Sequence, residues 1–166
     1  MNLFISTATN TINAVIYNDN EIIKSEKHLG HNDHTSTIYG IVKGLKIDYE
    51  KIKKIYIING PGSFTGLRVG VVLAKTLAME KKIDIYPVNL LELLEEQNDK
   101  KVAIDARGGK YFALDNKKIV IGEIKKDMIL DPSINIKLIN KSEYLKSIKP
   151  VNYLKLGIEY VKHPIT

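Results

Sequence analysis

The chain has 166 residues, of which 44% are hydrophobic and 27% charged, as in a soluble globular protein of one domain or two small lobes. It has no cysteine, which excludes disulfides and thiolate metal sites. The net charge of +6 has no basic pole, because residues 1–88 hold 11 Lys and Arg against 8 Asp and Glu, and residues 89–166 hold 14 against 11. We therefore expect the isolated chain to bind RNA only weakly. No apolar run reaches the roughly 20 residues of a membrane span, and the N-terminus lacks a signal peptide, so the expected location is the cytoplasm without membrane contact.

The first part of the chain predicts three short strands followed by a helix. Apolar runs at residues 3–5, 12–17 and 21–29 are separated by polar turns, which is typical of a meander. A helix-start cluster follows at residues 30–33. In the helix after it, four apolar residues have the spacing of one buried stripe: Ile38, Ile41, Val42 and Leu45.

The next strand, residues 54–58, runs into Gly60-Pro61-Gly62, which ends it because proline lacks a donor and glycine allows unusual backbone angles. Ser63 or Thr65 can then cap a second helix, which is apolar on most sides and should be covered on most sides. Small residues recur every four positions along both predicted helices. These two ridges are Ser36, Gly40 and Gly44, and Gly66, Gly70, Ala74 and Ala78.

We interpret the two ridges as a contact surface for a partner protein. The alternative is that the glycines only seat each helix on the chain's own sheet. If the second ridge faces outward, Gly70→Leu should leave the monomer folded and abolish pairing. Unfolding would mean that the ridge is internal packing.

A strand at residues 83–88 and a helix capped by Asn89 and running through residue 96 complete the order β-β-β-α-β-α-β-α. This order indicates an α/β protein, a mixed sheet with helices that is the core unit of the actin-like ATPase and ribonuclease H-like folds. A second meander is predicted at residues 102–106, 110–114 and 117–121, followed by a strand-like run at 134–139, a short helix at 142–147 and a strand at 151–161. We expect a first lobe at residues 1–96 and a shortened second lobe at residues 97–166.

Nucleotide binding by the glycine-rich loop is a weaker alternative, since neither G-x-x-x-x-G-K-[ST] nor G-x-G-x-x-G occurs there. Ser6 ends the first strand, where an actin-like kinase needs an acidic residue to hold magnesium. The neutral side chain disfavours an independent ATPase.

Other polar residues give little support for a catalytic or metal site. The histidines of residues 28–34 lack a neighbouring carboxylate cluster and favour capping or surface roles. Ser63, His34 and Asp105 could form a triad only on paper, because no G-x-S-x-G motif is present. Asp105 is more often a turn cap or a partner of Arg107 than a catalytic group.

The segment GPGSFTGLRVG at residues 60–70 closely resembles the signature of the bacterial TsaB (YeaZ) family of threonylcarbamoyladenosine synthesis. Supporting matches are Thr7-Ala8-Thr9, His34-Thr35, and Ile104-Asp105-Ala106-Arg107 with Tyr111. The resemblance covers residues 1–114, and KPVNYLK at residues 149–155 is similar to the family's terminal strand. Ser6 departs from the common aspartate, and the part after residue 114 is shorter than usual.

The resemblance implies an actin-like fold without catalysis of its own. Family members are partners of TsaD, which transfers threonylcarbamoyl to the adenosine beside the tRNA anticodon, and the ATPase TsaE joins them. It further implies a heterodimer with TsaD, a homodimer when TsaD is absent, and weak or indirect contact with tRNA. No cofactor is expected on this chain alone, with ATP and metal on the partner subunits. The contact surface would be formed by the first two helices, residues 35–45 and 66–78. Its expected residues are Ser36, Tyr39, Gly40, Lys43, Gly44, Gly66, Arg68, Val69, Gly70, Val72 and Thr76.

Two other functions stay open. The runner-up is a small actin-like phosphotransferase or peptidase that uses the 59–66 loop, and the third is a direct tRNA-binding module. Tight binding of ATP and magnesium by the isolated chain would favour the enzyme, and a salt-dependent gel shift would favour the tRNA-binding module.

Overall fold

A five-stranded mixed sheet is the centre of the computed structural model, which describes residues 1–29, 40–41, 43–46 and 48–158. Its strand order is β3-β2-β1-β4-β5. The strands are β1 (Asn2–Ser6), β2 (Thr11–Tyr17), β3 (Ile22–Leu29), β4 (Lys54–Gly60) and β5 (Ile85–Asn89). The first three form the predicted antiparallel meander, and β4 and β5 run parallel to β1. The fold is α/β, with a mixed sheet and helices, as the sequence predicts.

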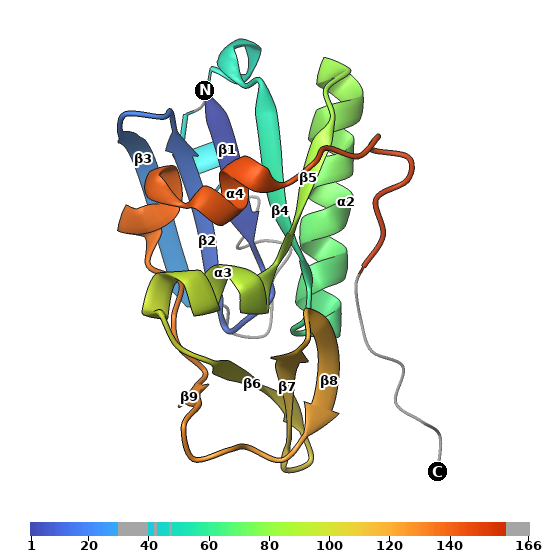
Figure 1. Ribbon diagram of the computed structural model, residues 1–166. Coiled ribbons are helices and arrows are strands. Elements are labelled where there is room, and N and C mark those ends of the chain that lie inside the picture. The colour runs from blue at the N-terminus through green and yellow to red at the C-terminus, as the bar shows by residue number, and fades with distance from the viewer. Residues whose placement is uncertain (30–39, 42, 47, 159–166) are drawn as a thin grey trace.

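Side chains alternate between the two faces of this sheet and build a separate core on each. Leu3 and Ile5 belong to the core that includes Val71 and Ala74 of helix α2 (Phe64–Lys81). Phe4, between them, belongs to the core that also holds the buried leucines of helix α3 (Leu90–Asn98). Figure 1 shows α2 alongside β4 and β5, and α3 and α4 on the other side of the sheet.

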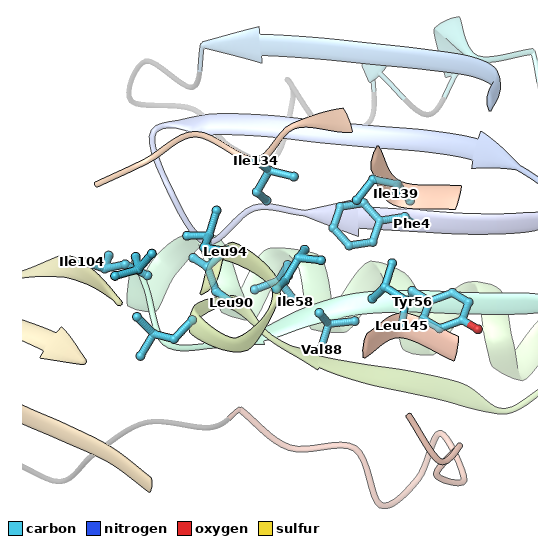
Figure 2. Close-up of a cluster of buried hydrophobic side chains, with 14 of the residues drawn as sticks. Phe4, Tyr56, Ile58, Val88, Leu90, Leu94, Ile104, Ile134, Ile139 and Leu145 are labelled. Carbon is cyan, nitrogen blue, oxygen red and sulfur yellow. The ribbon is translucent and has the colours of Figure 1, made fainter. Parts of the chain in front are cut away.

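The predicted second meander forms a smaller sheet with the order β8-β7-β6-β9. Its strands are β6 (Val102–Arg107), β7 (Lys110–Asp115), β8 (Lys118–Gly122) and β9 (Ile129–Leu130). The β6–β7 hairpin turns at Gly108 and Gly109, which both have positive φ, as the glycine pair predicts. Figure 2 shows Ile104 of β6 beside Leu94 of α3, so the second sheet is joined to the α3 core of the first.

The segment after β9 packs back against the first sheet instead of extending the second. The predicted strand at residues 134–139 is wrong, because a 3-10 helix, η2 (Ile136–Lys141), occupies that region and contacts β2 and β3. The reason is local. The amide of Gln97 accepts from Asn135 N at 2.9 Å and donates to Asn135 O at 3.1 Å, so a side chain takes the backbone groups that a strand partner would use. The short helix is confirmed as α4 (Glu143–Ser147), with Ser142 as its N-cap.

The C-terminal strand is also wrong in the part that the structure describes. Val151 forms a single antiparallel bridge with Ile85, and residues 152–158 contain no strand. Asn152 explains the break, because its side-chain oxygen accepts from Leu154 N at 2.9 Å and its carbonyl accepts from Lys155 N at 2.8 Å, which closes a turn. Residues 159–161 of the predicted strand lie outside the described residues. Since residues 134–158 contact the first sheet, the boundary between the two lobes stays a prediction.

Candidate partner-binding surface

Helix α2 begins at Phe64, two residues before the predicted start at Gly66, and is fixed to the sheet through Thr7. Ser63 is the N-cap, and its hydroxyl accepts from Gly66 N at 3.3 Å. Ser63 N donates to Ala8 O at 2.7 Å, and Thr7 Oγ1 donates to Gly66 O at 2.7 Å. These bonds hold the first turns of α2 against the segment that follows β1.

The small-residue ridge of α2 faces this contact and not a partner. Gly66 and Gly70 are buried, and a Cβ at Gly66 would lie 2.0 Å from the carbonyl oxygen of Thr7. A Cβ at Gly70 would lie 2.2 Å from Thr7 Oγ1 and 3.2 Å from Ile57 Cδ1. Ala74 and Ala78, the other members of the ridge, are also fully buried. The interpretation of this ridge as an outward docking face is therefore wrong, and its alternative, packing on the chain's own sheet, is correct.

The other predicted contact residues of α2 lie on its outer side. Arg68, Val72 and Thr76 are exposed and Val69 is half-buried. Of the earlier predicted helix, Gly40, Lys43 and Gly44 are helical and exposed, and among the described residues no atom lies within 4 Å of a Cβ built on either glycine. Ser36 and Tyr39 lie outside the described residues. These exposed positions remain predicted contacts.

Sequence reasoning missed Phe64 and Met79, two large apolar side chains on the outer side of α2. Phe64 is 55% exposed, Val72 62% and Met79 57%. Arg68 lies between the first two, with its guanidinium 5.2 Å from the centroid of the Phe64 ring. The spacing of Phe64, Arg68, Val72 and Thr76 every four residues was the signal, but Phe64 was assigned to the loop. We call Phe64, Arg68, Val72, Thr76 and Met79 the α2 surface.

A cleft of about 580 Å³ lies between the start of α2 and the second sheet. Ser63, Asp105, Arg107 and Asp131 are among its lining residues. Asp105 Oδ1 accepts from Arg107 N at 2.7 Å, and Asp131 Oδ1 accepts from Asp105 N at 2.8 Å. Asp105 thus caps a turn, the more common of the roles considered for it. In the described part of the chain no three His, Asp or Glu residues are grouped as metal ligands.

Ser6 and His34 were the other residues in the catalytic alternatives. Ser6 is the last residue of β1, is fully buried, and is not among the residues that line the cleft. Its hydroxyl has no hydrogen-bond partner among the described residues. His34 of the possible triad lies outside them.

Comparison with known proteins decides the family. The family model described as TsaD: tRNA N6-adenosine threonylcarbamoyltransferase matches residues 25–160. The tRNA threonylcarbamoyladenosine biosynthesis protein TsaB of Bacillus subtilis is 30% identical over 96 residues, which cover 55% of this chain and 42% of that protein. The protein of the same name from Escherichia coli is 29% identical over 121 residues, covering 66% and 52%. The chain belongs to the TsaB (YeaZ) family.

The chain spans about half the length of these TsaB relatives. Two solved structures support the fold. An uncharacterized protein with similarity to peptidase YEAZ from Pseudomonas aeruginosa aligns over 97% of this chain and 99% of its own, with a TM-score of 0.77 and 13% identity. YeaZ from Pseudomonas aeruginosa aligns over 74% of this chain and 64% of its own, with a TM-score of 0.59 and 19% identity. Within the described residues, no helix has the length and hydrophobicity needed to cross a membrane.

Proposed function

We propose that this TsaB family member is a non-catalytic subunit that binds and activates TsaD for threonylcarbamoylation of the adenosine beside the tRNA anticodon. TsaE is the further partner, and the location is the cytoplasm. The names of the curated relatives support the pathway. The α2 surface supports binding to a protein, because a row of exposed apolar side chains on one helix is typical of an interface.

The α2 surface is the observation that carries the proposal. Phe64, Val72 and Met79 together extend along most of an 18-residue helix, and Arg68 is the cation on it. Aromatic residues, methionine and arginine are the types enriched at interfaces. Because the matching family model is that of TsaD itself, the partner would share this fold, and a second copy of the chain could occupy the same surface when TsaD is absent.

The cleft supports a subunit without independent catalysis. Ser63 is engaged as a helix cap and Asp105 as a turn cap, and the first strand ends in the neutral Ser6. ATP and metal would then be bound by the partner subunits. A cleft whose polar groups serve the local backbone gives a nucleophile or a metal no prepared site.

The test is Val72→Arg, measured by calorimetric titration with TsaD from the same genome. We expect TsaD binding to weaken at least about tenfold, since a buried charge without a partner is costly at an interface. Threonylcarbamoylation by the TsaD complex should fall in parallel, while thermal unfolding of the variant is unchanged. Ile124→Arg is the matched control, because Ile124 is 42% exposed but lies outside α2.

Unchanged TsaD binding by Val72→Arg would exclude the α2 surface as the contact. The phosphotransferase or peptidase alternative is tested on the isolated chain, where tight binding of ATP with magnesium, or turnover of a peptide bond, would replace the proposal of a non-catalytic subunit. A salt-dependent gel shift with tRNA by the isolated chain would favour the tRNA-binding alternative.

A further inference from the structure

Strand β8 is an open edge of the second sheet. It pairs with β7 on one side, and the two strands are joined by a two-residue turn, Asn116-Lys117, in which both residues have positive φ. The residues that close such a turn, Asp115 and Lys118, exchange hydrogen bonds. Lys118, Val120 and Gly122 therefore point their backbone N–H and C=O groups toward β7. Ile119 and Ile121 therefore point their N–H and C=O groups outward. No further backbone bond to either is found among the described residues.

The sequence around this edge is complementary to itself in the antiparallel direction. Residues 117–123 read KKIVIGE. When two copies are aligned antiparallel about Val120, Ile119 meets Ile121 of the other copy and Val120 meets Val120. Lys117, in the turn before β8, and Glu123, directly after β8, bring opposite charges to both ends of this register. Lys118 meets Gly122, which has no atom within 4 Å of a built Cβ and so leaves room for a long side chain.

We propose that β8 pairs with β8 of a second copy of this chain, in an antiparallel register centred on Val120, to form a continuous sheet across the two molecules. The outward groups of Ile119 and Ile121 would make the new backbone hydrogen bonds. Val120, 39% exposed on the outer face, would pack on its symmetry mate. This interface is separate from the α2 surface and does not rest on the proposed function.

The other sheet edges do not offer this pairing. Of the outward positions of β5, Ile85 is paired with Val151, Pro87 has no N–H, and Asn89 N donates to Tyr144 Oη at 2.9 Å. Strand β9 has two residues. Strand β3 has a register shift in its pairing with β2, and its sequence, IIKSEKHL, carries two lysines against one glutamate. Charged residues usually keep an edge strand from pairing, but those beside β8 are of opposite sign where two copies would meet.

Disulfide trapping of Val120→Cys tests the register, since the chain has no other cysteine. Residues that face each other at a non-hydrogen-bonded antiparallel pair have Cα atoms about 4.5 Å apart, within the range that a disulfide spans. We expect oxidation to give a covalent dimer at least about tenfold faster than for Lys118→Cys, an exposed control on the same strand. In the proposed register the two Lys118 positions are about 13 Å apart, four strand residues. Equal rates for the two variants would overturn the proposal.

A charge exchange gives an independent test in the full chain. Glu123→Lys would place like charges opposite each other twice, and we expect association, measured by sedimentation, to weaken about two- to tenfold. Adding Lys117→Glu should restore it, because the pairs then have opposite charge again. Burial raises the pKa of the Glu92 carboxyl, and the charge of Lys117 opposes that shift. Because a change at Lys117 would also affect Glu92 within the chain, Glu123→Lys is the primary variant. The single and the double variant are both measured in a Val72→Arg background, so that association of two copies through the α2 surface does not add to the signal. Failure to restore association would overturn the register.

Discussion

Thr7 is the residue that determines how α2 is placed. It is fully buried, its hydroxyl donates to Gly66 O, and its carbonyl oxygen lies where a side chain on Gly66 would begin. A helical glycine costs stability relative to alanine, and here the cost is offset by a contact between backbones that no other residue would permit. The glycine spacing in the sequence signalled this close approach correctly, but spacing does not say which neighbour approaches.

Gly66→Ala is the direct test of that contact. We expect the free energy of unfolding to fall by about 2–3 kcal/mol, because the new methyl group would overlap the Thr7 backbone, which cannot rotate away. Urea denaturation measures the change. Gly40→Ala is the matched control, since no atom of the described part of the chain lies within 4 Å of a Cβ built there, and helix propensity should make it neutral or stabilising by up to about 1 kcal/mol. Equal stability of the two variants would show that α2 can move away from β1.

At the scale of elements, α3 organises the segment that follows the second sheet. Its Glu96 carboxylate accepts from Tyr144 N at 2.8 Å and from the Ser142 hydroxyl, which is itself the N-cap of α4. The side-chain amide of Gln97 holds Asn135 through both of its polar atoms, because Nε2 donates to Asn135 O and Oε1 accepts from Asn135 N. Polar side chains of one helix thus fix both η2 and α4. Alternating hydrophobicity alone could not reveal this, and it led to the wrong strand at residues 134–139.

Glu96→Ala should loosen this segment while the first sheet stays intact. It removes the acceptor for Tyr144 N and for the Ser142 hydroxyl, so we expect a loss of about 1–2 kcal/mol in unfolding free energy. Amide exchange should accelerate in α4 more than in β1. Glu80→Ala on the exposed side of α2 is the control and should change neither quantity. Uniform acceleration across the chain would contradict a role confined to η2 and α4.

For the whole molecule, the elements predicted correctly are those specified by short-range chemistry. Asn18 accepts from Asn20 N and Glu21 N, the glycine pair turns the β6–β7 hairpin, and Asn89 caps α3. The sequence alone could not decide which of two possible tertiary arrangements a segment would adopt. The ridge of α2 could face a partner or the sheet, and the C-terminal segment could form a strand or a single bridge. Phe64 and Met79 became candidate contact residues only when the buried side of α2 was known.

The last such choice, the bridge at Val151, closes one edge of the first sheet. Val151 N donates to Ile85 O at 2.7 Å and Ile85 N donates to Val151 O at 3.0 Å. Leu156 then packs into the core beneath α2, and the Asn59 side chain of β4 donates to Gly157 O at 3.3 Å, so the segment beyond the bridge stays attached to the first sheet. An edge strand left open is a template for association with other chains.

Val151→Pro removes the donor from this bridge and should expose the edge of β5. We expect a loss of about 1–3 kcal/mol in unfolding free energy, and faster aggregation on warming measured by light scattering. Val151→Ala keeps the donor and shortens the half-buried side chain, so it separates the bridge from the packing. The Ile85 amide should exchange faster in the proline variant than in the alanine variant. If the two variants unfold and aggregate alike, the backbone bridge contributes nothing beyond the valine side chain, and the edge is closed by Leu156 and its neighbours instead.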